Sequence, residues 1–302
     1  LYLEALKEYE MNHEYEKMAV LGTEAVNIID KKYRIRSEIA LKTSFAEYYL
    51  GHEEKMKELW YESYVSDMCQ VNFLRLFLED KMAKSFGMKA KELPYNVQKG
   101  NDYSTEKNEL QGNLPNSTTV TYLKFLFGDF EKVRKACVNP EKSLGWSGQF
   151  IGNGIKIFLL YLYNEEYLKK AISNLADETA FTFGFNKNEE FYYLEKDLSA
   201  GTGGDTEAFW MAFCKWRKYF TMTDNEKNKY LNWVEDTIEQ RTNAIVSGQF
   251  RNHYTDVAML ISVLGEVKES MGYKGAKQEL KGKYKKMFPR HSSFNNAVNK
   301  YM

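Results

Sequence analysis

Apolar residues recur at intervals of three and four along most of the chain, and strict alternation of apolar and polar residues is rare. The first pattern is typical of amphipathic helices and the second of half-buried strands. The sequence therefore predicts an all-α protein of about fourteen helices. In its first part we expect helices over residues 2–11, 14–29, 35–50, 53–65 and 72–86.

The N-terminal helices contain an internal repeat. HEYEKMAVLGTEAV (13–26) aligns with HEEKMKELWYESYV (52–65) at an offset of 38 or 39 residues, and GDFEKVRKACV (128–138) is a weaker third copy. This helix–turn–helix unit resembles tetratricopeptide-like repeats over residues 1–138. The resemblance implies a right-handed helical-repeat architecture, an α-solenoid of the kind that binds protein or peptide partners.

A stretch without periodicity separates two helical parts. Residues 89–118 carry Pro94, Pro115 and many Asn, Gly and Ser, which predicts a surface loop between a lobe of residues 1–88 and a C-terminal lobe of residues 119–302. Asn116 or Ser117 is expected to cap the following helix. Residues 155–163 are apolar on nearly all sides, which indicates a buried helix.

Two later segments are less regular. Residues 181–194 hold two aromatic runs around Asn186-Lys187-Asn188, so a hairpin is one interpretation, although a distorted helix or loop fits better. LSAGTGGDTEAFW (198–210) has neither the lysine of a P-loop nor the third glycine of a dinucleotide site. It predicts a flexible joint before a helix that starts near Asp205.

Further helices follow, and Thr223 with Glu226 forms a capping-box pattern before one of them. GWSGQFIGNG (145–154) predicts a turn with close helix packing, and the final pair of helices is rich in lysine.

Composition excludes several kinds of protein. Lys+Arg and Asp+Glu both number 42, so the net charge is zero and direct nucleic-acid binding is disfavoured, although a local basic patch is compatible with a neutral total. No apolar stretch approaches the ~18 residues of a membrane span. We expect a cytoplasmic protein and, because the chain begins at Leu1 inside a helical pattern, part of a longer one.

The sequence indicates neither a metal nor a cofactor. The three cysteines, Cys69, Cys137 and Cys214, form no CxxC pair, and we expect buried, reduced thiols. His13-Glu14 and His52-Glu53 lack the second histidine of an HExxH zinc site.

The C-terminal half shows a second resemblance. WVEDTIEQRTNAIVSGQFRNHYTDVAMLISVLGEV (233–267), KYKKMFPRHSSF (283–294) and GWSGQFIGNGIKIFLLYL (145–162) resemble the helical region that accompanies SWIM-type zinc-finger modules in uncharacterised bacterial proteins. The zinc pattern itself is absent, so the resemblance implies a helical scaffold and no zinc ligands.

Two sets of residues are candidate sites. Trp60, Tyr61 and Tyr64 are candidates for binding a protein or peptide partner, because exposed Trp and Tyr anchor interfaces; packing between helices is the alternative. A non-catalytic scaffold for protein–protein interaction is therefore the favoured function. The alternative function is a small anionic-ligand binder or enzyme with a site near Arg241, Arg251, His253 and Tyr254, although a structural role, capping and pinning an interhelix turn, fits these side chains better.

Overall fold

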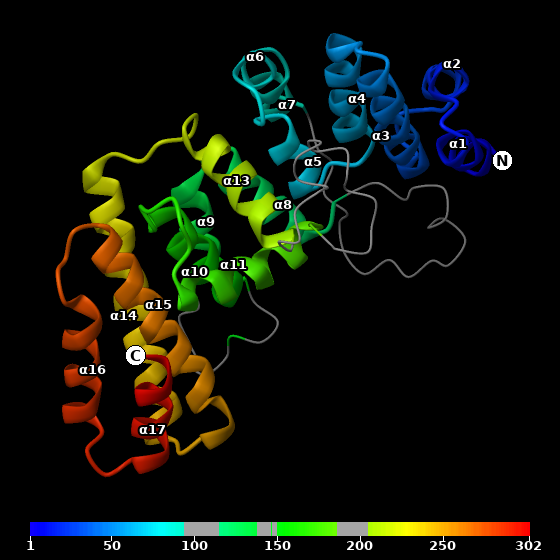
Figure 1. The fold of residues 1–302 in the computed structure, drawn as a ribbon. Coiled ribbons are helices and arrows are strands. Elements are labelled where there is room, and N and C mark those ends of the chain that lie inside the picture. Colours follow the sequence, from blue (N-terminus) through cyan, green and yellow to red (C-terminus); the bar gives the residue numbers. More distant parts are fainter. Residues whose placement is uncertain (94–114, 138–145, 147–149, 186–204) are drawn as a thin grey trace, which may run out of the picture. The chain divides into compact units, whose positions relative to one another are not determined.

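The computed structural model describes residues 1–93, 115–137, 146, 150–185 and 205–302, and every regular element in these ranges is helical (Figure 1). The predicted all-α class is confirmed for this part of the chain. The expected surface loop lies largely outside it, as do residues 186–204, which hold most of the candidate hairpin and the three glycines before Asp205.

The helices form two compact units, and each is interrupted in sequence. The first unit comprises Leu1–Gly128 and Ala180–Phe220, and the second comprises Asp129–Thr179 and Thr221–Met302. This division differs from the lobes of residues 1–88 and 119–302 that we expected. Residues 119–128 and 180–220 belong with the N-terminal helices because their aromatic side chains pack there, as Phe220 does on Phe77 with ring centroids 5.6 Å apart.

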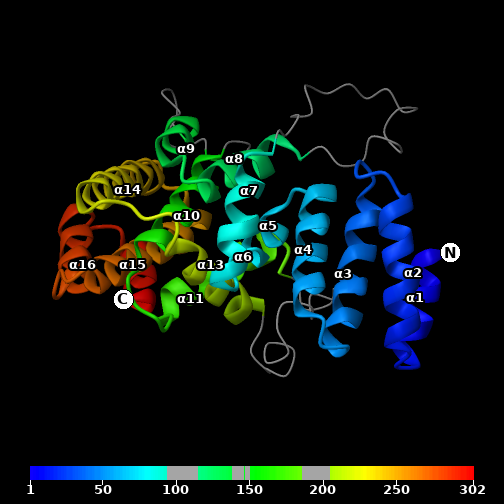
Figure 2. The same cartoon turned by 90° about the horizontal axis from the view of Figure 1, so that it is seen from above.

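Four helices open the first unit and follow one another side by side (Figure 2). Their observed ends lie within two residues of the expected ones, because their apolar faces are strongly periodic. Leu6, Met18, Ile39 and Leu59 contribute to one shared core. The four helices are α1 (Tyr2–Met11), α2 (Tyr15–Ile28), α3 (Arg34–Tyr49) and α4 (Glu53–Ser66).

The sequence repeat is also a repeat of backbone conformation. His13 (φ 56°) and Gly51 (φ 77°) are both left-handed residues that follow a helix. In each turn the next N–H donates to a carbonyl five residues back: Glu14 to Tyr9 and His52 to Glu47, both at 2.8 Å. This is the Schellman arrangement, which satisfies the last carbonyls of a helix. The two helix pairs α1–α2 and α3–α4 are thus closed by the same turn.

The continuous helix expected over residues 72–86 was wrong. Leu76, Phe77 and Leu78 are buried one after another, which a helix with a single buried face cannot achieve. The chain instead forms four short pieces: α5 (Gln70–Arg75), α6 (Asp80–Met82), the π-helical turn η1 (Ala83–Gly87) and α7 (Met88–Lys91).

The rest of the first unit packs around α5. Asn116 caps α8 (Ser117–Leu126) by accepting the N–H of Thr119 at 2.8 Å, which confirms the expected cap. The indole of Trp216, on α13 (Asp205–Arg217), donates to the carbonyl of Leu126 at 2.8 Å. Both α8 and α13 contact α5, so these helices form one packed group.

The second unit is built on apolar helices. Residues 155–163 are buried apart from Lys156, so the predicted central helix is confirmed as α10. Thr223 and Glu226 form the expected capping box. Figure 1 shows α14 to α17 packed together. The elements are α9 (Phe130–Ala136), α10 (Ile151–Leu162), α11 (Lys170–Phe183, which continues into the first unit), α14 (Asp224–Ser247), η2 (Arg251–His253), α15 (Tyr254–Ser270), α16 (Ala276–Met287) and α17 (Ser292–Tyr301).

Each unit contains very close packing at glycines, and the closest contact in each lies at Gly22 and Gly154. A Cβ on Gly22 of α2 would overlap the hydroxyl of Thr43 on α3, and a Cβ on Gly154 of α10 would overlap the sulfur of Cys137. The close packing expected for residues 145–154 is therefore present at Gly154. All three cysteines are free, and Cys137 is buried, whereas Cys69 and Cys214 are partly exposed. Burial raises the pKa of the Cys137 thiol to about 12.

The described part of the hairpin candidate, residues 181–185, is helical up to Phe183 and leaves the helix at Gly184. Helix α11 continues through Phe183, so residues 181–183 belong to its last turn.

Candidate functional site

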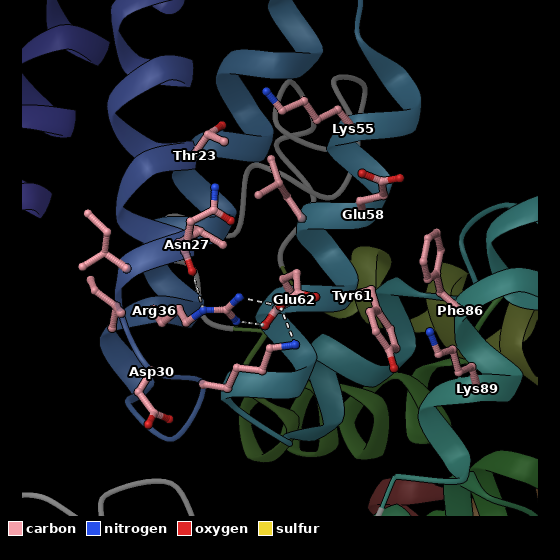
Figure 3. A pocket seen from close by; sticks show the side chains of 15 residues that line it. Thr23, Asn27, Asp30, Arg36, Lys55, Glu58, Tyr61, Glu62, Phe86 and Lys89 are labelled. Atoms are coloured by element: carbon pink, nitrogen blue, oxygen red, sulfur yellow. Dashed lines mark hydrogen bonds and ion pairs between the residues drawn. The ribbon is translucent and has the colours of Figure 1, made fainter.

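The first unit contains an open groove of about 800 Å³, shown in Figure 3. Its size lies within the range of ligand-binding cavities. One wall comes from α2 and the turn after it, the floor from α4, and the other wall from η1 and α7. The lining residues are Thr23, Val26, Asn27, Ile28, Ile29, Asp30, Lys31, Arg36, Lys55, Glu58, Leu59, Tyr61, Glu62, Phe86 and Lys89.

The floor of the groove follows from the spacing of residues on α4. Lys55, Glu58 and Glu62 recur at three and four, so they lie on one side of the helix and face the groove. Trp60 and Ser63 are buried on the other side. The sequence of α4 therefore presents a charged row to the groove, and its buried side is uncharged apart from Lys57, which is paired with Glu79 at 2.8 Å.

A buried arginine fixes the base of the groove. The Arg36 side chain is only 5% exposed. Its Nε donates to the Val26 carbonyl at 2.9 Å, Nη1 to Ser66 Oγ at 2.7 Å and Nη2 to Glu62 Oε2 at 2.5 Å. Lys31 Nζ lies 3.5 Å from the same Glu62 oxygen. The charge of Glu62 is thus already balanced, and α2, α3 and α4 are joined by one network.

Aromatic side chains form the second wall. The rings of Tyr61 and Phe86 lie 5.2 Å apart, and Lys89 Nζ is 5.1 Å from the centre of the Tyr61 ring. Burial raises the pKa of the Tyr61 phenol, and the neighbouring Glu62 adds to the shift. The wall therefore combines apolar rings with one cation above them.

Three polar side chains of the groove remain available to a ligand, and a fourth polar group in its lining is buried. Within the described residues, Asn27, Glu58 and Lys89 are exposed and form no hydrogen bond or ion pair, and Thr23 Oγ1 is a buried atom with no hydrogen-bond partner. Figure 3 shows them on both walls and the floor rather than around one point. The groove thus offers donors, an acceptor and both signs of charge along its length.

The aromatic residues singled out in the sequence have a different place. Trp60 and Tyr64 are 3% and 1% exposed. The Trp60 indole donates to Ser44 Oγ at 3.1 Å, and the Tyr64 ring packs on Phe73 at 5.5 Å. Both therefore pack between helices and offer no exposed surface to a partner. Tyr61 is also buried, but its ring reaches the groove wall.

The second candidate set is divided between a buried residue and exposed ones. Tyr254 is buried, with its ring 5.7 Å from that of Phe294, whereas Arg251 and His253 are exposed. They lie in or beside the short turn η2 between α14 and α15. Of these three side chains, Tyr254 packs into the core, whereas Arg251 forms no hydrogen bond or ion pair within the described residues, so the turn-pinning interpretation stays a prediction for Arg251.

The fourth member of that set, Arg241, is held over an indole. Its guanidinium carbon lies 4.9 Å from the centre of the Trp146 ring, and desolvation lowers its pKa despite the opposing effect of Asp256. Asp256 also shares a 3.0 Å hydrogen bond with His253 Nδ1. Asp256 was not predicted from the sequence to belong here. Its carboxylate already lies beside the cations and so opposes the binding of another anion.

The described residues show neither a metal centre nor a membrane span. No group of three or more His, Cys, Asp or Glu side chains in these ranges is placed to hold a metal ion. None of the helices drawn from the described ranges has the length and apolar character needed to cross a membrane.

The comparisons with known proteins match neither a protein-family model, nor a curated protein, nor a solved structure. Function is therefore inferred from the groove and from the surface of the helices.

Proposed function

We propose that this chain is a non-catalytic helical scaffold with a tetratricopeptide-like arrangement, and that its groove binds a peptide segment of a partner protein. The repeat of sequence and turn conformation in α1–α4 supports the architecture. The groove of about 800 Å³ over α4 is the observation that carries the binding function.

The distribution of free polar groups favours a peptide over a small ion. A small anion needs donors that converge on one point, whereas Asn27, Glu58 and Lys89 lie on three different elements. An extended or helical segment meets such groups one after another along its length.

The charges define the kind of segment. Lys55 is paired with Glu47 at 2.6 Å and Arg36 with Glu62, which leaves Lys89 and Glu58 to act on a partner. Leu59 and Phe86 lie in the same groove and supply apolar surface. The expected partner segment carries an acidic side chain for Lys89, a basic one for Glu58 and an apolar residue between them.

A random-peptide library tests this proposal. The full chain is immobilised, peptides displayed on phage are selected, and the enriched peptides are synthesised and measured by fluorescence polarisation. We expect enrichment of the acidic–apolar–basic order. Asn27→Arg, which places a long side chain in the groove, should abolish binding, and Lys89→Glu should weaken it by about fivefold.

Matched variants outside the groove control for charge. Lys84→Glu and Glu38→Lys change exposed helical residues that do not line the groove. They should leave binding unchanged. If the selected peptides bind Asn27→Arg as tightly as the unmodified chain, the groove is not the binding site.

A further inference from the structure

The helix α16 and the residues next to it are strongly basic, although the whole chain is neutral. Residues 274–290 contain seven Lys and Arg and a single acidic residue, Glu279. The net charge of zero over 302 residues therefore conceals a concentrated positive segment in the second unit.

The cations of this segment divide into two groups. Lys277 and Lys283 are directed to carboxylates of α15 and α14, with Glu266 at 2.9 Å and Glu239 at 2.6 Å. Five others form no ion pair or hydrogen bond within the described residues: Lys274, Lys281, Lys285, Lys286 and Arg290. We call these five residues the basic face.

The basic face follows the length of α16, where Lys281 and Lys285 are partly exposed and Lys286 is exposed. Lys281 and Lys285 lie four residues apart on one side of the helix, about 6 Å along its axis, and Lys286 is adjacent. Lys274 precedes the helix, Arg290 follows it, and both are exposed. Like charges this close repel one another, and a polyanion would relieve that repulsion.

Most apolar residues of α16 point the other way. Ala276, Leu280 and Tyr284 are buried in the second unit, so they cannot enter a lipid bilayer. Gln278 and Gly282 lie among the lysines, and Met287, 37% exposed at the end of the helix, is too little on its own for an apolar anchor. A membrane-binding helix needs such an anchor, which makes a lipid surface a poor fit.

The side chains of the basic face also indicate which kind of polyanion it binds. Protein interfaces favour aromatic residues and Arg and are depleted in Lys, and single strands need exposed aromatic rings on which bases stack. The basic face has one Arg, and the exposed ring of Tyr273 next to Lys274 already has Lys268 Nζ over it, 5.8 Å from its centre. A row of lysines without a bidentate reader instead matches the phosphates of a duplex, which carries one charge per ~1.7 Å of its axis.

We propose that the basic face of α16 binds the phosphate backbone of double-stranded nucleic acid without sequence preference. The binding is electrostatic, it uses the second unit, and it does not depend on the peptide groove. A chain with no net charge thereby acquires a function that its overall composition disfavours.

Duplex binding is measured on the full chain by fluorescence anisotropy, with labelled DNA duplexes of about 20 base pairs and two unrelated sequences at about 50 mM salt. We expect equal affinity for both sequences. The triple variant Lys274→Gln/Lys281→Gln/Lys285→Gln should bind about tenfold more weakly or worse. The slope of log affinity against log salt should fall by about 0.9 for each phosphate that the variant no longer neutralises.

A matched triple variant removes the same charge elsewhere. Lys7→Gln, Lys84→Gln and Lys135→Gln alter exposed helical lysines that form no ion pair in the described part of the chain. This variant should retain the affinity and salt slope of the unmodified chain. An equal loss in both triple variants, or no binding by the unmodified chain, would overturn the proposal.

Two further probes decide the kind of polyanion. Vesicles of phosphatidylserine and phosphatidylcholine and a poly-glutamate chain are titrated under the same conditions. Weaker binding of both than of the duplex supports the assignment. Binding of either that equals or exceeds duplex binding, and that the α16 triple variant loses, would show that the face does not select nucleic acid.

Discussion

The interior of the first unit contains several buried ions, whereas the interior of the second is almost wholly apolar and aromatic. In the described part of the second unit, Glu266 is the single buried residue with a charged side chain, and it accepts the N–H groups of Ala171 and Ile172 at the start of α11. The first unit buries five residues with charged side chains within its described part: Arg36, Lys42, Glu47, Lys57 and Arg75.

The comparison shows two ways of positioning helices. A buried charged side chain is costly unless it is paired and hydrogen-bonded. A buried ion of the first unit therefore fixes the position of the segment that carries its partner. In the second unit the helices are positioned by how well large side chains fill the interior. The Phe158 ring, for example, packs on the rings of Tyr230 and Trp233, with centroids 4.8 Å and 5.2 Å apart. We expect the first unit to be sensitive to the loss of one polar group and the second to the loss of volume.

The largest expected effect is in the first unit, at Arg36. Arg36→Leu leaves the Glu62 carboxylate with Lys31 alone and strands the Val26 carbonyl, so the free energy of unfolding should fall by about 3 kcal/mol. Hydrogen exchange should show the loss of protection in α2–α4 and little change in α14–α15.

Two companion variants sharpen that test. Ile157→Val, in the buried part of α10, should cost only about 0.5–1.5 kcal/mol. The double variant Arg36→Leu/Glu62→Leu should recover much of the stability, because removing both ions avoids a stranded charge. If the double variant is no more stable than Arg36→Leu, the buried pair is not the cause.

The next effect concerns the two close helix approaches. Gly22→Ala and Gly154→Ala should each lower the free energy of unfolding by about 1–3 kcal/mol, because the new methyl group overlaps Thr43 or Cys137. Chemical denaturation measures both.

Second-site substitutions distinguish the two approaches. Cys137→Ala should restore all the stability that Gly154→Ala loses. The Cys137 sulfur alone overlaps the new methyl carbon, whereas the Cys137 Cβ lies 3.6 Å from it. Thr43→Ala should restore only part of the stability that Gly22→Ala loses, because the Thr43 Cβ itself lies 2.9 Å from the new methyl carbon. Equal rescue at both sites would contradict this difference.

A smaller effect is expected at a strained turn. Gln249, in the second unit, has a φ of 56°, and its turn has the same bonding as the turn at Gly51, with Phe250 N–H donating to the Ile245 carbonyl at 3.0 Å. Gln249→Gly should raise the free energy of unfolding by about 0.5–1 kcal/mol, while Gly51→Ala should lower it. Thermal denaturation measures both variants. If their midpoint temperatures shift in the same direction, the two turns do not share one conformation.

The smallest effect concerns a surface ion pair. Hydrogen bonds from Arg134 and then Lys229 lower the pKa of Glu131 from 4.5 to about 2. A lowered pKa stabilises the fold above about pH 4.5, and this contribution disappears as the pH falls towards 2. Because Glu131 is partly exposed, Glu131→Gln should cost under about 1 kcal/mol at pH 7 and remove that part of the pH dependence.

An NMR titration of the carboxyl groups provides a direct measurement. Lys229→Met should move the pKa of Glu131 back towards its ordinary value. A titration unchanged by that substitution would show that Lys229 does not contribute.

Local signals predicted much of the helical fold. The ends of α1 to α4, the Asn116 cap and the Thr223 capping box each depend on residues close together in sequence, and all were predictable. The break after α5 was not, because it depends on where Phe77 and Leu78 find room in the folded unit. The packing of α13 on α5 had no local signal either, since more than a hundred residues separate the two helices.

The site was less predictable than the fold. The four-residue spacing of Trp60 and Tyr64 places them on the same side of α4. It does not show whether another helix will cover that side or leave it exposed. The groove needs α2, α4 and η1 to be placed in space, so Asn27, Glu58 and Lys89 give no sequence signal as a set. Lys55, Glu58 and Glu62 were the available hint, as a charged row opposite a buried face.

The interleaved order of the two units has a consequence for protein synthesis. Residues 129–179 leave the ribosome before residues 221–302, with which they form the second unit, and the segment between them completes the first. During this interval α10, buried on nearly all sides in the finished fold, lacks α14 and α15, against which it packs. Domains tend to fold as they emerge, and exposed apolar segments aggregate or engage chaperones. We therefore expect the nascent chain to be most dependent on chaperones after residue 162 and before α15 has been made.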